Sequence, residues 1–300
     1  MKSLHILFHS PEVWRDTLSR TWLTKYLVIG ICLVLALPAH AQLLDWGKAE
    51  QIDADSLRRE FDKGPYFSLY KDNYFIFGPS VGPKATKENT NVKFQISIRQ
   101  KLTKSTLPWG TYLYLCYTQK VFWNVLEKSL PMKDLNFNPG IGLAKHVFKN
   151  GKYFGKFFLL LEHESNGRDS IESRSWNRLS LGCDLLLTNN LLIHGKVWVP
   201  YVDGENNKDL LKYVGICQAG VEVMSNDRRW KGSIVLVKRK TWKFNFNTIA
   251  EISWQFSKKA DWSLFAQYYN GYGEGLLDYN KFSSQLRAGI VIRPKLFSDY

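Results

Sequence analysis

The sequence predicts an all-β fold, a twelve-stranded antiparallel transmembrane β-barrel. Two observations lead to it: about twelve segments of roughly ten residues alternate apolar with polar side chains, and a short apolar export signal precedes them. A period of two places alternate side chains on opposite faces of a strand. In hydrocarbon every backbone N–H and C=O must be paired, and among sheets only a closed barrel achieves this without free edges.

The alternative fold is a soluble β-sandwich or a lipocalin-like barrel, in which the apolar faces close on an internal core. Charged and amide side chains recur on the opposite faces of the predicted strands, and aromatic residues gather near the strand ends. Aromatic girdles of this kind are typical of the two membrane–water interfaces, so the pattern favours a membrane barrel. The aromatic residues expected in these girdles are Trp109, Trp123, Trp176, Trp198, Trp262, Tyr268, Tyr269 and Tyr272.

The chain begins with a predicted export signal. Residues 26–37 form an apolar run that follows basic residues and precedes an A-x-A cleavage motif, as in a secretory signal peptide. The run is too short for a membrane-spanning helix, which needs about 20 apolar residues. We therefore expect a signal peptide over residues 1–41 and a polar periplasmic arm over 42–66. Residues 67–300 form the predicted outer-membrane barrel domain.

Polar or glycine-bearing turns separate the predicted strands of this domain. In one of them, Val92, Phe94 and Ile96 alternate with polar residues. If both termini are periplasmic, the fifth strand runs outward and ends near residue 165, level with the outer leaflet. The predicted strands lie near residues 67–78, 91–103, 109–122, 138–148, 154–166, 174–187, 191–202, 211–224, 230–239, 243–256, 261–272 and 282–294.

The formal net charge of +14 is compatible with several anionic partners. We find no zinc-ligand spacing, helix-turn-helix pattern or Lys/Arg-rich run, so the sequence argues against nucleic-acid binding. A basic surface facing anionic lipid headgroups fits the spread of charge better. Cys116, Cys183 and Cys217 remain after the predicted signal peptide, and an odd number within strand patterns argues against a disulfide framework.

The candidate active site lies between Glu162 and Arg178, in the sequence EHESNGRDSIESRSWNR. Alternation places His163 and Ser165 on the apolar face of one strand, and Asn177 on the apolar face of the next. A serine needs a base within reach to act as a nucleophile, and the base needs a third group to orient its ring. A neutral amide in that third position avoids burying a charge against lipid. These residues therefore suggest hydrolysis at a membrane, although a His-x-Ser pair alone has little specificity.

The segments HESNGR and SRSWNR resemble the active-site hairpin of the bacterial outer-membrane phospholipase A family. The resemblance continues, in family order, through FSLYKDNYFIF, VKFQISI, YTQ, KYVGICQ and YNGYGEGLLDYN, and covers roughly residues 65–293. It implies a phospholipase A1/A2 and lysophospholipase that cleaves acyl ester bonds. In this resemblance Ser165 matches the nucleophile, His163 the general base and Asn177 the residue that orients it. Gly167 matches a backbone N–H of the oxyanion hole.

The resemblance also implies a dependence on calcium, bound between two barrels of a homodimer. Arg168 matches a ligand that acts through its carbonyl, and Ser173 one that acts through its hydroxyl. Ser129 matches a carbonyl donated by the partner, and Gln119 a polar residue in the dimer interface. An acidic calcium ligand of the family falls on Asn206 here, a departure that puts this ligand in doubt. Asp169 and Ser170 also stand in the reverse of the expected order.

Two other functions stay open at this stage. A lipid A deacylase-type esterase would differ in its substrate but not in its nucleophile. A porin-like or structural outer-membrane barrel would have no catalytic activity, and its charged inner face would line a pore. The expected partners of the enzyme are phospholipid substrate, outer-membrane lipid and a second copy of the chain.

Overall fold

A computed structural model describes most of the predicted barrel domain. The predicted signal peptide, residues 1–41, lies outside the described residues, as does most of the predicted arm at 42–66. The described residues are 62–149, 152–202, 204–241, 243–257 and 260–294.

Thirteen strands account for most of these residues. They are β1 (Phe67–Leu69), β2 (Asn73–Pro79), β3 (Thr90–Lys101), β4 (Tyr112–Trp123), β5 (Met132–Lys149), β6 (Lys152–Ser165), β7 (Ser175–Thr188), β8 (Leu191–Tyr201), β9 (Cys217–Met224), β10 (Trp230–Lys238), β11 (Phe246–Trp254), β12 (Trp262–Gly271) and β13 (Ser283–Ile292).

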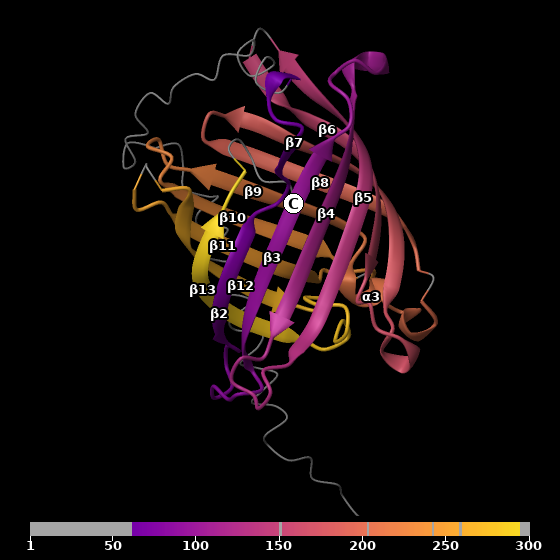
Figure 1. The fold of residues 1–300 in the computed structure, drawn as a ribbon, viewed down its shortest axis with the longest axis vertical. Helices are drawn as coiled ribbons and strands as arrows, with labels where there is room; N and C mark the ends of the chain where they lie inside the picture. The colour runs from indigo at the N-terminus through magenta and orange to yellow at the C-terminus, as the bar shows by residue number, and fades with distance from the viewer. Residues whose placement is uncertain (1–61, 150–151, 203, 242, 258–259, 295–300) are drawn as a thin grey trace, which may run out of the picture. The chain divides into compact units, whose positions relative to one another are not determined.

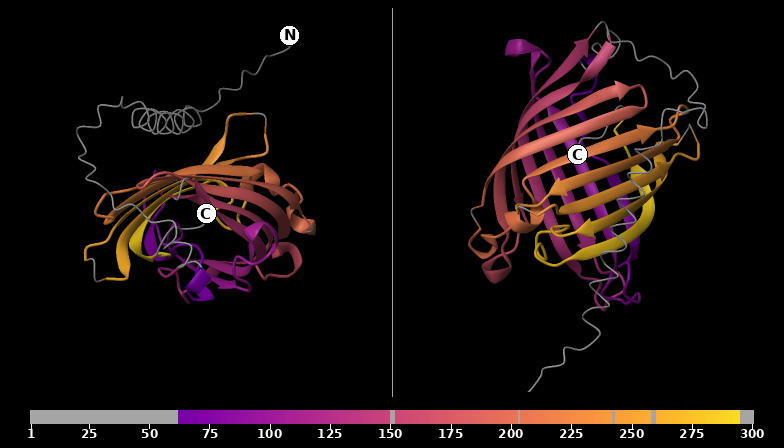
Figure 2. Two further views of the ribbon diagram at one scale, coloured as in Figure 1. Left: turned by 90° about the horizontal axis from the view of Figure 1, so that it is seen from above. Right: turned by 180° about the vertical axis from the view of Figure 1, so that it is seen from behind.

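The strands β2 to β13 close into a ring. Each pairs antiparallel with its neighbours in sequence, and β13 pairs with β2. Figures 1 and 2 show β3, β4 and β5 on one side of this ring and β9 to β12 on the other. The short strand β1 pairs with β3 beyond the end of β2, so the first predicted strand is present but interrupted between them. The predicted twelve-stranded transmembrane barrel is therefore confirmed.

The outer face of the ring is apolar because of the period-two alternation. On β6, Leu159 and Leu161 are 42% and 52% exposed, whereas Leu160 between them is fully buried. At the end away from the candidate active site, the outward rings of Trp230 and Trp254 stack with centroids 5.7 Å apart. Exposed aliphatic side chains bordered by tryptophan are what a hydrocarbon-facing wall requires.

Part of the predicted aromatic girdle is wrong. Trp176 and Tyr269 are buried and face the lumen, which Trp198 also lines. The reason is the alternation itself, since Tyr268 and Tyr269 are neighbours on β12 and cannot both face lipid. The polar group of each inward ring has a partner. The Trp176 indole N–H donates to Glu164, and the Tyr269 hydroxyl donates to the carbonyl of Tyr272.

The predicted strand bounds hold to within a few residues except at two places. β5 begins at Met132, six residues earlier than expected, and β9 begins only at Cys217. The segment before β9 instead forms a short helix, α3 (Leu211–Val214). No helix in the described part of the chain is long and apolar enough to cross a membrane.

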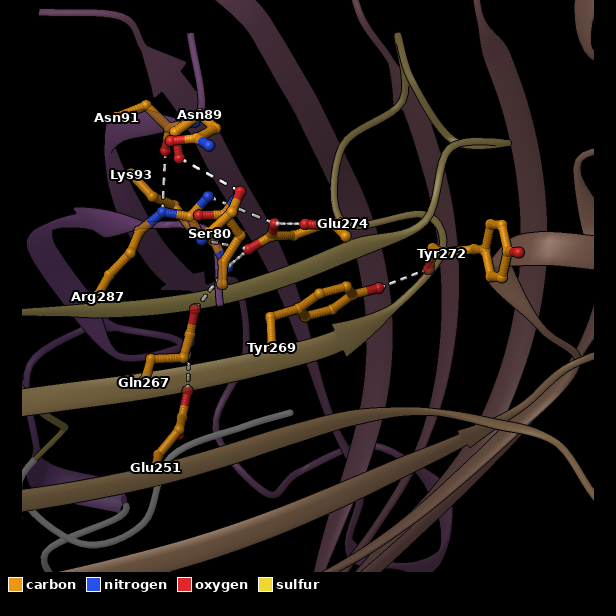
Figure 3. Close-up of polar contacts among 12 residues, drawn as sticks. Ser80, Asn89, Asn91, Lys93, Glu251, Gln267, Tyr269, Tyr272, Glu274 and Arg287 are labelled. Carbon is orange, nitrogen blue, oxygen red and sulfur yellow. Dashed lines mark hydrogen bonds and ion pairs between the residues drawn. The ribbon is translucent and has the colours of Figure 1, made fainter. Parts of the chain in front are cut away.

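The loop between β12 and β13, residues 272–282, folds into the lumen. Glu274, near the start of this loop, is only 7% exposed. The Glu274 carboxylate accepts from Lys93 at 3.2 Å, Arg287 at 2.7 Å and Ser283 at 2.9 Å (Figure 3). A buried carboxylate needs such partners, and a turn motif alone does not reveal them.

The loop also reaches β5 and β7. The backbone N–H groups of Leu276 and Leu277 donate to the side chains of Asn136 and Asp134 on β5, at 3.1 and 3.0 Å. Leu276 and Tyr279 pack against Trp176 on β7, so the loop spans the lumen from β13 to β7. The remaining lumen cavity has a volume of about 240 Å³ and polar walls that include Gln95, Lys120 and Gln218.

We predict that Glu274→Gln destabilises the barrel by about 3–5 kcal/mol, because it leaves Lys93 and Arg287 buried without their counter-charge. Asp278→Asn is the matched control in the same loop. Its partners Lys133 and Lys281 are partly exposed, so its loss should cost less than about 1 kcal/mol. Denaturant unfolding in detergent micelles measures both, and equal losses would contradict the prediction.

The same carboxylate predicts a pH dependence. Burial alone would raise the pKa of Glu274, but the charges of Lys93 and Arg287 outweigh it and lower the pKa from 4.5 to about 2. Because the pKa is lower in the folded state, ionised Glu274 stabilises the barrel above about pH 4.5. This stabilisation is lost as the pH falls toward 2. The free energy of unfolding of the wild type should therefore fall across this range, and that of Glu274→Gln should fall less.

Candidate active site

His163 and Asn177 face each other across the β6–β7 hairpin. They are directly paired in register, and His163 Nδ1 lies 2.9 Å from Asn177 Oδ1. An amide oxygen can only accept, so Nδ1 carries a proton and Nε2 is the nitrogen left to act as a base. The ring is thereby set in the tautomer that a general base requires. The predicted histidine–asparagine pair is present in the structure.

Ser165 lies two residues after His163 on β6, on the same outward face. Its cross-strand neighbours are Ser175 on β7 and Phe137 on β5. The same face continues into exposed aliphatic side chains, with Leu161 52% and Leu179 45% exposed. The three predicted catalytic side chains therefore lie on the wall that faces lipid.

The loop that joins the two strands is organised by Asn166, which is buried. Its side-chain oxygen accepts from the backbone N–H of Arg174 at 3.0 Å, and its amide donates to the carbonyl of Glu172 at 2.8 Å. Arg168 forms an ion pair with Glu172 and donates to the carbonyl of Lys133 at the start of β5. These contacts fix the backbone directly after Ser165.

Gly167 adopts a left-handed backbone conformation, with φ of +63°. A Cβ atom at this position would lie 2.8 Å from Cε2 of Phe137, closer than side-chain carbons pack. Both the conformation and the close contact require glycine. The position predicted to supply an oxyanion-hole N–H is therefore one where the backbone turns sharply against the neighbouring strand.

An ion-pair cluster lies on the lumen side of the same two strands. Glu162, beside His163, is paired in register with Arg178, beside Asn177, and accepts from its guanidinium at 2.8 and 3.1 Å. Lys196 on β8 lies 2.9 Å from the same carboxylate. Two cations therefore contact one buried carboxylate, and Glu164, which accepts from Arg178 at 3.1 Å, supplies the second negative charge. This cluster holds β6 to β7 at the level of the catalytic pair.

The loop that crosses the lumen packs behind the same residues. Leu276 and Tyr279 join Trp176 and Leu210 in one buried apolar cluster. Burial and a 2.6 Å hydrogen bond to Asp209 raise the pKa of Tyr279 to about 12, so its phenol stays protonated and donates. Trp176 directly precedes Asn177 in the chain. The lumen loop therefore supports the catalytic hairpin from inside.

The predicted calcium ligands lie in three different loops at the site end. Arg168 and Ser173 are in the catalytic loop, and Asn206 is in the loop between β8 and β9, where its amide donates to the carbonyl of Ser170 at 2.8 Å. Ser129 is in the loop between β4 and β5, with φ of +71°. The structure thus brings Asn206 to the catalytic loop, while Ser129 is exposed on another loop.

These four positions offer carbonyl, hydroxyl and amide oxygens, which are hard ligands that suit calcium. Among the described residues, none donates a hydrogen bond to the Ser129 or Arg168 carbonyl, the Ser173 hydroxyl or the Asn206 amide oxygen. The Ser173 carbonyl, which is not a predicted ligand, accepts from Arg174. Among the described residues no group of three His, Cys, Asp or Glu side chains could hold a metal ion. The residues present therefore fit a cation site of neutral oxygen donors.

Sequence reasoning missed the residues that support the site from within. Asn138 on β5 donates to the carbonyl of His163 at 2.7 Å, and Glu162, Arg178 and Lys196 form the inner ion cluster. A signal for Glu162 and Arg178 was available, because each adjoins a predicted catalytic residue and faces the opposite side of the wall. No local pattern identifies Lys196 or Asn138, since their contacts depend on the register of other strands.

A model of the phospholipase A1 family matches residues 65–292. The chain belongs to this family. Phospholipase A1 of Escherichia coli strain K12 is 31% identical over 209 residues, which cover 67% of this chain and 69% of that protein. Phospholipase A1 of Proteus vulgaris is 29% identical over 244 residues, or 74% of this chain and 80% of that protein.

The fold of this family member is also found in solved structures. Outer membrane phospholipase A from Escherichia coli matches with a TM-score of 0.66 at 26% identity, over 76% of this chain and 98% of that structure. The calcium-bound dimer of the Salmonella typhi outer membrane phospholipase matches with a TM-score of 0.68 at 24% identity, over 81% and 98%. At that identity the second match shows the shared fold.

We predict that Glu162→Gln lowers kcat for ester hydrolysis by about tenfold to a hundredfold, because misplacing a catalytic pair by a fraction of an ångström is costly. The matched control is Glu222→Gln. It removes the buried carboxylate of β9 that lies 2.6 Å from the Lys231 ammonium of β10. Both variants should lose similar stability in denaturant. If Glu222→Gln lowers kcat equally, the inner cluster has no specific role in positioning the site.

Proposed function

We propose that this protein is a calcium-dependent outer-membrane phospholipase A that hydrolyses acyl ester bonds of phospholipids. Membership of the phospholipase A1 family makes the chain a lipid ester hydrolase. The observation that carries the finer proposal is the His163–Asn177 hydrogen bond beside Ser165, on the wall that faces lipid. An acyl chain on this wall lies against aliphatic side chains, with its ester near the hydroxyl.

In the proposed reaction the Ser165 hydroxyl attacks the acyl carbonyl while His163 Nε2 takes its proton. The tetrahedral intermediate collapses, and the imidazolium returns the proton to the departing lysophospholipid oxygen. His163 then deprotonates a water molecule, which attacks the acyl-enzyme ester, and the imidazolium returns that proton to the departing Ser165 oxygen as the fatty acid leaves. Asn177 keeps the ring oriented throughout. As a neutral group it stabilises the imidazolium less than a carboxylate would.

The backbone after Ser165 supplies the oxyanion site in this proposal. Gly167 allows the sharp turn that places its N–H near the nucleophile, and preorganised donors of this kind favour the charge that develops on the carbonyl oxygen. Arg168, Ser173 and Asn206 would hold calcium, with Ser129 contributed by the partner barrel. When bound, the ion supplies positive charge that stabilises the oxyanion.

We infer that the protein acts as a homodimer through the wall that carries the site. Gln119 on β4 lies on this outward face and accepts from the Tyr117 hydroxyl at 3.2 Å, among exposed aliphatic residues such as Leu115 and Ile141. A polar amide on a lipid-facing wall is costly unless it is covered, which supports an interface there. The site lies at the end of the barrel opposite the start of β2 and the end of β13, and we assign this end to the outer leaflet.

A specific observation counts against the porin alternative. The loop at residues 272–282 spans the lumen, and buried ion pairs fill much of the remaining interior. A lipid A deacylase-type esterase would keep the same nucleophile, so only a comparison of substrates separates it from a phospholipase.

The principal test is fatty-acid release from phospholipid in detergent micelles. We expect release with calcium, none with a chelator, and none from Ser165→Ala, which should stay folded because the residue is half-buried at a strand end. Release that survives Ser165→Ala would overturn the proposed nucleophile. Lipid A as the only hydrolysed substrate would favour the deacylase.

We predict that Asn177→Ala lowers kcat by more than about tenfold but by less than the 10²–10⁴-fold expected for loss of the general base itself. Its amide orients His163 and transfers no proton. Cys183→Ala, on the same outward face of β7, is the control and should keep wild-type kcat. Complete loss of activity in Asn177→Ala would indicate a more direct role in the reaction.

We also predict that the wild-type protein forms no steady pore in a planar lipid bilayer, because its lumen is crossed by the loop that Glu274 anchors. Single-channel conductance measures this directly. A lasting ohmic current from folded protein would contradict the filled lumen and return the porin function to consideration.

A further inference from the structure

In the loop between β10 and β11, the described residues 239–241 and 243–245 lie around the ammonium group of Lys238. Lys238 is the last residue of β10 and faces outward, since Val237 before it lines the lumen. Its Nζ donates to the carbonyls of Arg239 at 2.7 Å, Thr241 at 2.8 Å and Lys243 at 3.0 Å. Three carbonyls directed at one cation give the loop a defined shape.

The base of this loop is fixed to its neighbours. The Arg239 guanidinium lies 4.9 Å from the ring centroid of Tyr272, and Figure 3 shows this ring turned away from the Glu274 cluster. The backbone N–H of Lys240 donates to the carbonyl of Leu211, at the start of α3. The loop is thus held at the same end of the barrel as the candidate active site, with β8 and β9 between it and the catalytic hairpin.

The tip of the loop exposes an aromatic ring. Phe244 is 94% exposed and packs edge-on against Phe246, with ring centroids 5.3 Å apart. Phe246 is the first residue of β11 and faces outward, because Asn247 after it is buried in the lumen. Phe244 therefore extends the lipid-facing wall beyond the end of the strand, at the level where lipid headgroups begin.

The cations of this loop have no acidic partners. The segment from Arg239 to Asn245 contains no Asp or Glu. In the part of the chain that the structure describes, Arg239, Lys240 and Lys243 form no ion pair. Lys240 and Lys243 are exposed beside Phe244. Basic residues beside an aromatic ring at a membrane boundary match anionic headgroups above acyl chains.

We propose that Lys240, Lys243 and Phe244 of this loop bind phosphate-bearing membrane lipids of the leaflet at this end of the barrel. Lys240 and Lys243 contact the phosphate oxygens, and Phe244 lies among the upper parts of the acyl chains. The occupant is a lipid headgroup and not a free anion, because the exposed Phe244 ring beside the lysines can contact acyl chains but gains nothing from a free phosphate ion. This lipid site is separate from Ser165 and does not depend on hydrolysis.

Ether-linked phosphatidic acid tests the proposal, since it has no ester bond to cleave. It and the matching phosphate-free dialkylglycerol are titrated into the protein in octyl glucoside micelles, and native mass spectrometry gives the apparent Kd of each. The variants are Lys240→Gln/Lys243→Gln and Phe244→Ser. The matched control is Lys84→Gln/Lys87→Gln, which removes two exposed lysines from the loop between β2 and β3 at the same end. Far-UV circular dichroism checks that each variant is folded.

We expect the wild type to bind the phosphate lipid at least about tenfold more tightly than the dialkylglycerol, from about two lysine–phosphate contacts. Lys240→Gln/Lys243→Gln should lose most of this preference, and the control should keep it. Phe244→Ser should weaken binding of both lipids. Equal losses in the control, or no preference in the wild type, would overturn the proposal. Displacement of the lipid by inorganic phosphate at the same concentration would show a simple anion site and overturn lipid docking.

Discussion

The register between β6 and β7 is the constraint on which the rest of this structure depends. His163 meets Asn177 on the lipid side only because Glu162 meets Arg178 on the lumen side. Side chains alternate along a strand, so a slip of one residue would turn the catalytic pair inward and bring the ions against hydrocarbon. Arg178, Lys196 and Ser180 all bind Glu162 and oppose such a slip. A buried ion cluster is weak evidence of net stability, but here it specifies one pairing.

The lumen is the scaffold of a site that lies outside it. Within one barrel, no strand lies in front of the proposed catalytic pair on its outward wall, so its position has to be fixed from behind and by the adjoining strands. Asn138 holds the His163 carbonyl, Trp176 packs on the lumen loop, and Phe137 limits the catalytic turn at Gly167. The loop that Glu274 anchors connects this region to the far wall. The same features that position the pair also fill the space through which a porin would conduct.

The loops at the site end are arranged for two kinds of contact with lipid. The catalytic loop and the loop carrying Asn206 present neutral oxygens close to Ser165, and neutral donors bind a divalent ion weakly unless further ligands complete the site. That gives a physical reason for the proposed dependence of activity on a second barrel. The loop at residues 239–245 instead presents lysine and phenylalanine without acidic partners. The proposed hydrolytic site and the proposed lipid-binding site would thus lie on different strands at the same end of the barrel.

The sequence by itself determined the barrel and most strand positions, because period-two alternation is a local property. Its resemblance to a known family, not spacing alone, indicated Ser165, His163 and Asn177 as the proposed catalytic residues. The sequence could not determine which aromatic residues face lipid in a run such as Tyr268–Tyr269, nor that Glu274 lies in the lumen. Those outcomes depend on contacts between residues up to 181 positions apart, such as Lys93 with Glu274. Closure of the ring decides which distant side chains share the interior. A charged side chain is stable there only where closure also brings an oppositely charged partner.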